Sequence, residues 1–489
     1  MTHRSLRRTP FFLLFPLLAA STGSCTSHQP EDERLVALRV VPADARSQDR
    51  PASGSGAQNE AQRLRDMGFD VVEGSEHGPS LDIIATRGEM DRLHELGYQA
   101  EVTGVGAPLA STGTDAVPYP TLTQMLDTLH SIETQYPDIA KVVDLTEKYG
   151  APVTANGRHL FALKISDNVA QDEDEPTYLL VSNHHARELG PPVVAMLAAE
   201  KLTKQYATDE RIKRAVDSTE IWIAPTWNPD GLEHVHTVDN FWRKNRRPNT
   251  GGSFGVDLNR NYPFLWTSSC TGDTRPNSDV YKGPSEASEP ETQTMVAWST
   301  DRHFSKVLDF HSSGREVLVN YSCANFALTD YFQTIGTELS HQMGYDGSTR
   351  RPSSQGEHPD WQLGNLSNLA FLVEINTQFQ PPYASAQAEA EQIWPGILWH
   401  LERPTPLSGH VTDASTGTPV AATVLVKEVP YTQGEKNSSG GPFGRYQAYL
   451  PAGTYTVEIS AAGYQTESRT VTVTADGEAT LDVALTRSE

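Results

Sequence analysis

Apolar segments of strand length alternate with helical patterns from residue 119 to residue 404, and this alternation restricts the fold more than any other feature. Strands that alternate with helices favour an α/β domain, in which helices cover both faces of a mixed sheet. The predicted strands are Arg158–Ile165, Thr177–Ser182, Glu220–Thr226, Lys306–Phe310 and Ala370–Ile375. The predicted helices are Leu122–Tyr136, Pro192–Gln205 and Ala384–Leu401.

Different patterns flank this domain on both sides. Residues 61–105 predict a small α+β unit, whereas residues 26 to about 60 are polar, end in a Pro/Gly/Ser-rich stretch and predict little structure. Beyond residue 404, short strands separated by turns predict a β-sandwich. We therefore expect four regions: a leader (1–25), a linker with the α+β unit (26–117), the α/β domain (118–404) and an all-β domain (405–489).

The first 25 residues have the composition of an export signal. Three arginines precede a ten-residue apolar run, Phe11 to Ala20, which is too short to span a bilayer as a helix. Small residues then lead into Cys25, which resembles a bacterial lipoprotein signal and would anchor the chain to a membrane. Ordinary secretion is the alternative. In an oxidising compartment, Cys270 and Cys323 could form a disulfide or remain two buried thiols.

The charge balance excludes one class of partner. The chain has 62 acidic residues against 39 Lys and Arg, a formal net charge of −23, so it lacks the broad basic surface that a nucleic acid requires. The stretch 241–260 is an exception, with five basic residues and one acidic residue. This local charge suits one small anion.

Metal-ligating residue types follow two of the predicted strands. His185 and Glu188 come directly after the strand that ends at Ser182, and a histidine and a carboxylate three residues apart can bind one zinc ion if a third ligand arrives. His311 ends another apolar strand, and 122 residues lie between it and Glu188. At this point the sequence resembles the zinc metallocarboxypeptidases of the carboxypeptidase A/B type, and its His-His-Ala-Arg-Glu form is similar to the bacterial carboxypeptidase T branch.

Further blocks in the same order carry this resemblance. They are Asn228-Pro229-Asp230-Gly231, Trp242-Arg243-Lys244-Asn245-Arg246, Asp257-Leu258-Asn259-Arg260-Asn261, and Tyr281-Lys282-Gly283 with Ser288-Glu289. The resemblance implies an eight-stranded mixed sheet and one catalytic Zn²⁺ on His185, Glu188 and His311. It also implies that Arg246 polarises the scissile carbonyl, that Asn259 and Arg260 hold the substrate's terminal carboxylate, and that Arg187 and Arg243 line the cleft. The substrate would be the C-terminus of a peptide or protein, and a planar guanidinium suits such a carboxylate.

Glu374 is the candidate general base. It lies in an otherwise apolar strand, where an ionised carboxylate needs a partner. The resemblance places the family's catalytic glutamate in such a strand, next to the metal site. The sequence departs from the family in one respect, because no tyrosine stands in the loop before Trp361 and the nearest, Tyr345, comes seven residues too early. Pro359 falls near the base of the side-chain pocket, so neither basic nor acidic selectivity is expected.

The flanking regions also fit this resemblance. Residues 61–105 stand where these enzymes carry a propeptide that covers the cleft, with cleavage expected between residues 104 and 117; a permanent accessory domain is the alternative. The C-terminal region resembles a transthyretin-like module, with stabilisation and surface or polysaccharide contact both open. The expected function is therefore an exported zinc metallocarboxypeptidase. A cell-wall peptide hydrolase of the same fold and a non-catalytic surface binding protein remain alternatives.

Overall fold

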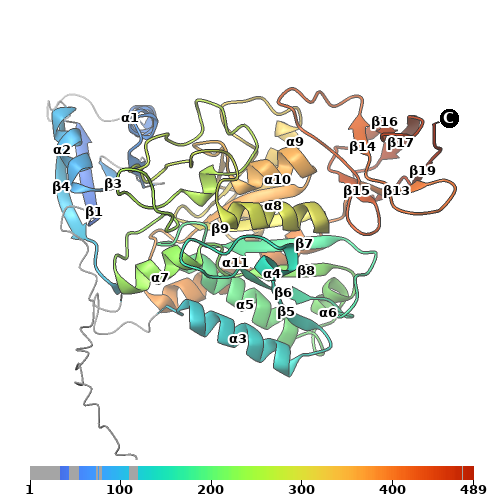
Figure 1. Ribbon diagram of the computed structural model, residues 1–489, viewed down its shortest axis with the longest axis horizontal. Coiled ribbons are helices and arrows are strands. Elements are labelled where there is room, and N and C mark those ends of the chain that lie inside the picture. The colour runs from blue at the N-terminus through green and yellow to red at the C-terminus, as the bar shows by residue number, and fades with distance from the viewer. Residues whose placement is uncertain are drawn as a thin grey trace, which may run out of the picture.

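The computed structural model describes residues 34–42, 54–72, 75, 80–109, 119–475 and 477–488. The predicted leader and Cys25 lie outside these residues. Figure 1 shows three bodies in chain order, with the largest in the middle and the C-terminal strands at one end of it. No described helix is both long enough and apolar enough to cross a membrane.

The N-terminal unit is a four-stranded antiparallel sheet, in the order β2-β3-β1-β4, with two helices. Its elements are β1 (Val36–Pro42), α1 (Gly54–Asp66), β2 (Asp70–Val71), β3 (Leu81–Ala85), α2 (Arg87–Glu95) and β4 (Tyr98–Val105). The expectation of little structure up to residue 60 is wrong. β1 pairs with two strands and buries Val36, Leu38 and Val40, because its apolar residues alternate within a segment that is polar on average.

The middle body contains the predicted mixed sheet, with eight strands in the order β11-β10-β12-β9-β7-β8-β6-β5. Its strands are β5 (Ala140–Asp144), β6 (Phe161–Ile165), β7 (Thr177–Ser182), β8 (Glu220–Ala224), β9 (Lys306–Ser312), β10 (Glu316–Leu318), β11 (Thr349–Arg350) and β12 (Leu369–Ile375). The four central strands β12, β9, β7 and β8 are parallel to one another. β7 pairs with β8 on one side and β9 on the other, so the direction of winding switches beside β7, where α/β folds place their ligands.

Helices cover both faces of this sheet, as predicted. Figure 1 shows α8 and α10 above the strands and α3 and α5 below them. The helices are α3 (Leu122–Gln135), α4 (Leu145–Tyr149), α5 (Gly190–Lys204), α6 (Glu210–Asp217), α7 (Pro229–Thr237), α8 (Pro290–Arg302), α9 (Thr329–Gln342), α10 (His358–Leu366) and α11 (Tyr383–Glu402), with a 3-10 turn at Leu258–Arg260. α3 begins with a capping box between Thr121 and Gln124.

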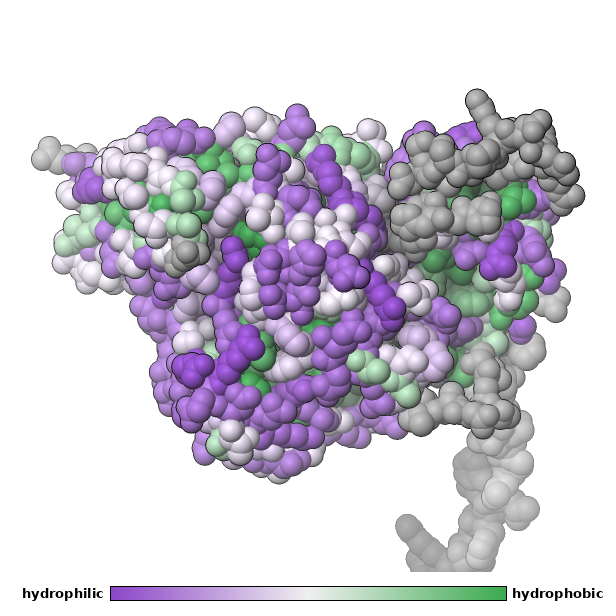
Figure 2. All heavy atoms as spheres, turned by 180° about the vertical axis from the view of Figure 1, so that it is seen from behind, coloured by the Kyte–Doolittle hydropathy of each residue, from purple (hydrophilic) through white to green (hydrophobic). Residues whose placement is uncertain are grey.

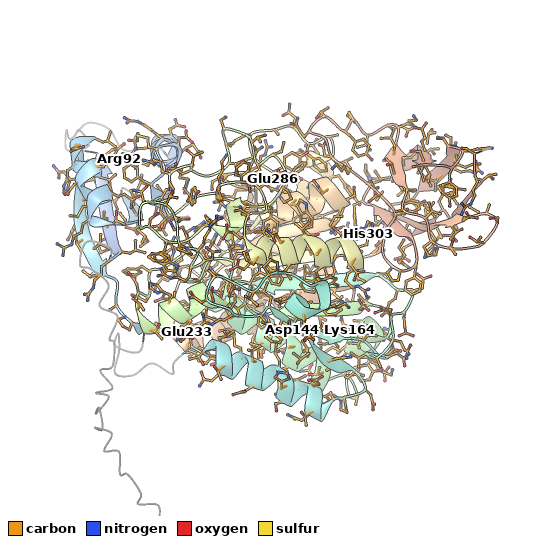
Figure 3. The ribbon with its side chains drawn as sticks, viewed as in Figure 1. Arg92, Asp144, Lys164, Glu233, Glu286 and His303 are labelled. Carbon is orange, nitrogen blue, oxygen red and sulfur yellow. A yellow bond between two sulfur atoms is a disulfide. The ribbon has the colours of Figure 1, made fainter. Side chains whose placement is uncertain are left out.

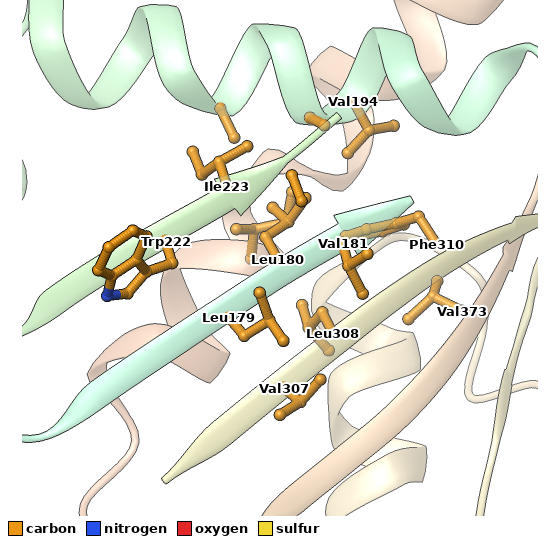
Figure 4. Packing of buried hydrophobic residues seen from close by; sticks show 14 of the residues in the cluster. Leu179, Leu180, Val181, Val194, Trp222, Ile223, Val307, Leu308, Phe310 and Val373 are labelled. Atoms are coloured by element: carbon orange, nitrogen blue, oxygen red, sulfur yellow. The ribbon is translucent and has the colours of Figure 1, made fainter. Parts of the chain in front are cut away.

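The central strands are buried along their whole length because helices lie on both faces. Every residue of β9 and β12 is buried, which explains why these segments read as continuous apolar runs. Figure 4 shows Leu180, Val181, Leu308 and Phe310 on neighbouring strands of the sheet, with a helix over one of its faces. His311 and Glu374 lie near the carboxyl ends of β9 and β12.

The C-terminal domain consists of two small sheets around a core of its own, as predicted for an all-β region. Its strands are β13 (Leu407–Asp413), β14 (Thr423–Val426), β15 (Arg445–Ala448), β16 (Gly453–Ser460), β17 (Glu467–Val473), β18 (Ala479–Thr480) and β19 (Val483–Leu485). It touches the middle body through polar contacts: Tyr321 Oη donates to Glu435, and Gln447 Nε2 donates to the carbonyl of Phe304 at 3.0 Å. Figure 2 shows a mostly hydrophilic face on which hydrophobic residues form small separate areas.

Candidate active site

The loop after β7 presents two of the predicted metal ligands. Asn183 adopts a left-handed backbone conformation, with φ of 62°, which asparagine tolerates better than most residues. Its side-chain amide donates to the carbonyls of His185 at 3.0 Å and of Glu188 at 3.1 Å. The loop is thereby folded onto itself, and His185 and Glu188 face the same point.

His311 at the end of β9 completes the predicted triad. His185 Nδ1 lies 2.8 Å from Glu188 Oε1 and 3.1 Å from His311 Nδ1, and His311 Nδ1 lies 3.1 Å from Glu188 Oε2. Two ligand atoms bound to one tetrahedral zinc at about 2.1 Å would be about 3.4 Å apart. The donor types and their separations therefore fit one zinc ion with room for a fourth ligand.

A second group of possible ligands shares His311 with this triad. His184, Asp309 and His311 also lie within metal-binding distance of one another. Among the described residues, His185, Glu188 and His311 all line one cavity of about 130 Å³, which the N-terminal unit also lines, whereas His184 and Asp309 do not line it. We therefore place the zinc in the triad, where a substrate could reach it.

Two buried aspartates orient the histidine ligands. Asp257 Oδ1 lies 3.1 Å from His185 Nε2, and Asp309 Oδ1 lies 3.3 Å from His311 Nε2. Burial opposes the charge of Asp257, but Arg243 and His185 together hold the pKa of this carboxyl well below its usual range. Carboxylates in this position fix the imidazole orientation and strengthen metal binding.

Asp309 also holds two histidines that have no contact with the cavity. It lies 3.1 Å from His184 Nδ1 and 3.0 Å from His358 Nδ1. Burial lowers the pKa of His184 to about 4, so this imidazole is neutral, and its other nitrogen accepts from Tyr262 Oη at 2.9 Å. This network is fully buried and holds Asp309 of β9 in place.

Glu374 lies beside the triad because of strand register. β12 and β9 are parallel neighbours, and Glu374 pairs with His311. Neighbouring strands lie about 4.8 Å apart. The Glu374 side chain is buried, lines the cavity and reaches the same space as the triad.

The two arginines of the Trp-Arg-Lys-Asn-Arg block line different cavities. Arg246 does not line the cavity of the zinc triad, so its position does not fit the role that was expected for it. The Arg246 guanidinium lies over the rings of Trp242 and Phe254, at 4.4 and 4.7 Å, and lines a different hollow. Arg243 lines the cavity instead. It donates to Asp257 Oδ2 through Nε at 3.0 Å and Nη2 at 2.9 Å, and its Nη1 lies 3.9 Å from Glu188 Oε1.

Asn259 and Arg260 both line the cavity, as expected. Asn259 Oδ1 accepts from the backbone N–H of His358 at 2.8 Å, which turns its amide toward His311. Arg260 Nη1 forms an ion pair of 3.1 Å with Glu357, and both side chains are almost completely buried. The sequence provides no signal for this pairing.

The N-terminal unit closes the cavity. Residues of α1 and β2 line it, and Asp70 forms an ion pair with the guanidinium of Arg187. Only 5% of the Asp70 side chain and 1% of the Arg187 side chain are exposed. Arg187 also lies over the ring of Phe379, at 4.3 Å. Arg187 is thus at the cavity, as expected, but its charge is matched by the N-terminal unit.

The described lining of the cavity lacks the tyrosine that the family carries in the loop before Trp361. There is no tyrosine among the described residues that line it, and Tyr345 donates instead to Glu389 at 2.8 Å outside the cavity. Cys270 lines the cavity and forms a disulfide with Cys323, with a Cα–Cα distance of 6.4 Å. Of the two alternatives left open for these cysteines, the structure has the disulfide.

Comparison with known proteins agrees with this geometry. Residues 125–395 match the zinc carboxypeptidase family, and residues 406–486 match the carboxypeptidase regulatory-like domain. The zinc carboxypeptidase of Saccharothrix mutabilis subsp. capreolus is 32% identical over 270 residues, which cover 51% of this chain and 59% of that protein. The carboxypeptidase N catalytic chain of Rattus norvegicus is 27% identical over 417 residues, which cover 74% of this chain and 85% of that protein.

Among solved structures, carboxypeptidase A from Helicoverpa armigera has the same fold. The superposition covers 76% of this chain and 97% of that chain, with a TM-score of 0.60 and 19% sequence identity. The specific resemblance to the carboxypeptidase T branch stays a prediction. The family match over more than half of the chain, together with the zinc triad, shows that this protein belongs to the zinc carboxypeptidase family.

Proposed function

We propose that the protein is an exported zinc metallocarboxypeptidase that removes C-terminal amino acids from peptides through attack of a zinc-activated water. The observation that carries this proposal is one cavity lined by the zinc triad, by Glu374 and by three arginines of the middle body, Arg187, Arg243 and Arg260. Export rests on the composition of the first 25 residues alone. Lipidation at Cys25 is part of the same proposal, and incorporation of labelled palmitate that is lost in Cys25→Ser tests it.

Substrate binding follows from Asn259 and Arg260. A peptide's terminal carboxylate accepts two parallel hydrogen bonds from a guanidinium, and Asn259 Nδ2 supplies a third donor from the side of the triad. This contact places the last peptide bond, and no internal bond, beside His311. The pair also argues against a cell-wall hydrolase whose substrate lacks a free carboxylate there.

The chemical step uses Glu374 and Arg243. Zinc, when bound, supplies a Lewis acid that polarises the carbonyl and makes water a stronger nucleophile. Glu374 is placed to take the proton from that water and then to give it to the leaving amine. Arg243, which is 3.9 Å from the ligand Glu188, donates to the carbonyl oxygen as negative charge develops on it. We therefore assign to Arg243 the role that the sequence suggested for Arg246.

The N-terminal unit is proposed to be a propeptide. The contact between Asp70 and Arg187 and the contribution of α1 and β2 to the cavity support a cover that excludes substrate. Cleavage in the segment that precedes Tyr119 would then open the cleft. For the C-terminal domain, the contact between Glu435 and Tyr321 supports a stabilising role, and surface or polysaccharide contact remains a proposal.

One substrate series tests the proposed reaction. After limited proteolysis has opened the cleft, the zinc-loaded protein should release single C-terminal residues from N-blocked peptides. It should lose this activity with a chelator and should leave peptides with amidated C-termini intact. Glu374→Gln should reduce kcat by a factor of about 100 or more while zinc stays bound. A chain that binds these peptides without cleaving them would be the non-catalytic binding protein, and normal activity of Glu374→Gln would refute the assignment of the base.

A further inference from the structure

Beside the catalytic base, the lining of the cavity includes two leucines from neighbouring strands. On β12, Leu372 lies two residues before Glu374 and therefore on the same face of the strand. Leu318 of β10 is its cross-strand partner, and both leucines line the cavity. A side chain that follows the scissile bond would lie over these two leucines, with its methylene groups against their surfaces.

A carboxylate also lines this cavity. Glu357 directly precedes α10, only 3% of its side chain is exposed, and its Oε1 forms the 3.1 Å ion pair with Arg260. Asp360, one turn further into the helix, is buried nearby, and burial together with Glu357 raises the pKa of Asp360 well above its usual range. Of these two acids, Glu357 is the one that lines the cavity and pairs with Arg260. Pro359, which sequence position had suggested, does not line the cavity.

Glu357 competes with the substrate for one guanidinium. The proposed partner of Arg260 during binding is the terminal carboxylate, so this carboxylate and Glu357 meet at the same group. Two carboxylates against one cation in a buried site leave one charge without compensation, which is strongly unfavourable. A cationic substrate side chain removes the conflict, because it pairs with Glu357 while Arg260 turns to the terminal carboxylate.

We propose that Glu357 makes this enzyme selective for substrates that end in lysine or arginine. The inference rests on the proposed carboxypeptidase function and deepens it. In the empty pocket, Arg260 and Glu357 neutralise each other; in the complex, each pairs with one charge of the substrate's last residue. The apolar walls of Leu318 and Leu372 accept the long aliphatic stem of such a residue, as lysine and arginine stems commonly pack.

A positioning role for Glu357 makes a different prediction. If the carboxylate only orients Arg260, its loss would weaken every substrate equally, since all of them present the same terminal carboxylate. If it binds the side chain, only cationic substrates would suffer. The decisive comparison is between lysine and norleucine, because these side chains have similar length and apolar surface and differ in the terminal ammonium.

The experiment compares N-blocked peptides that are identical except for a last residue of lysine, arginine, norleucine, phenylalanine or glutamate. The zinc-loaded chain is assayed before and after limited proteolysis, with the protease removed. We expect kcat/KM for lysine and arginine to exceed that for norleucine by at least about 10-fold. Glu357→Gln, which keeps an acceptor for Arg260 and removes the uncompensated charge, should abolish this ratio by lowering kcat/KM for lysine and raising it for norleucine.

Two variants control for folding and for charge in general. Glu357→Asp keeps the charge and should retain part of the preference for lysine. Glu286→Gln removes the same charge from an exposed position before α8, labelled in Figure 3, and should retain the whole preference. A calorimetric arm measures binding of the lysine and norleucine peptides to zinc-loaded Glu374→Gln, with and without Glu357→Gln, and so does not depend on hydrolysis.

The outcomes separate the two hypotheses. If no peptide is cleaved, the proposed function fails, and the calorimetric arm alone decides whether Glu357 binds a cation. Tighter binding of lysine that is lost with Glu357→Gln supports the inference in either case. Equal or better use of norleucine by the wild type, or an equal loss for every peptide in Glu357→Gln, would overturn it.

Discussion

The contact between Asp70 and Arg187 predicts how strongly the N-terminal unit closes the cleft. Both side chains are almost completely buried, and they belong to different bodies of the fold. Removal of one partner from a buried ion pair typically costs about 3–5 kcal/mol. In Asp70→Asn this free energy is lost from the association of the N-terminal unit with the middle body, while Arg187 keeps its position over Phe379. We use the lower limit of about 3 kcal/mol, which corresponds to roughly a hundredfold weaker closure.

The assay measures kcat/KM of the uncleaved chain on a chromogenic peptide. Asp70→Asn should raise the activity of the uncleaved chain up to about a hundredfold, with the fully cleaved enzyme as the ceiling, and should leave the cleaved enzyme unchanged. Asp82→Asn is the matched control in the same unit. Its carboxylate pairs with Arg39 at 3.5 Å, and about half of each side chain is exposed, so the pair contributes about 0–1 kcal/mol.

Two results would refute this reasoning. If Asp70→Asn and Asp82→Asn raise the uncleaved activity equally, the buried pair does not hold the cover in place. If the uncleaved wild type is as active as the cleaved enzyme, residues 34–109 form a permanent accessory domain and not a propeptide.

Three further predictions concern the surroundings of the site. Asp257→Asn should weaken zinc binding by about 10- to 100-fold in a chelator titration, because His185 loses the carboxylate that orients it; unchanged zinc affinity would contradict this. Tyr321→Phe removes the hydroxyl that donates to the C-terminal domain and should lower the free energy of unfolding by about 1–2 kcal/mol in urea; an unchanged midpoint would show that this contact is not stabilising. Burial, with the negative charge of the neighbouring Asp70, raises the pKa of Asp279 from 3.8 to about 7. The closed form therefore binds the extra proton, so closure is strongest at low pH and weakens as the pH rises to about 7. Uncleaved activity should rise over that range relative to cleaved activity, and Asp279→Asn should remove this rise.

The sequence predicted best those features that local patterns encode. β7, β9 and β12 are buried on both faces and read as apolar runs, so a polar residue at a strand end was conspicuous. His311 and Glu374 were found in this way, and parallel register then brought them together. β1 was missed because the averaged polarity of its surroundings concealed a short alternating pattern.

The arginines show where sequence reasoning stops. Arg243 and Arg246 lie three residues apart in a loop without a repeating period, so neither spacing nor composition indicates which guanidinium faces the zinc triad. The answer depends on Asp257, which comes from another loop and holds Arg243. The same limit applies to Glu357, whose role depends on an ion pair between residues that are 97 positions apart.

The three arginines that the middle body contributes to the cavity explain how a cationic cleft exists inside an acidic protein. Each guanidinium is neutralised in the covered state: Arg243 by an aspartate of the same domain, Arg187 by Asp70 of the N-terminal unit, and Arg260 by Glu357 of the pocket. Only the last two partners can be exchanged, one by removal of the cover and one by substrate. Each ion pair is thus exchanged for another, and no buried ion is left without a partner. An unpaired buried ion would be costly in a site of low polarity. A substrate that offers only a carboxylate pairs with Arg260 but leaves Glu357 without a cation. A substrate that offers both a carboxylate and a cation pairs with Arg260 and with Glu357.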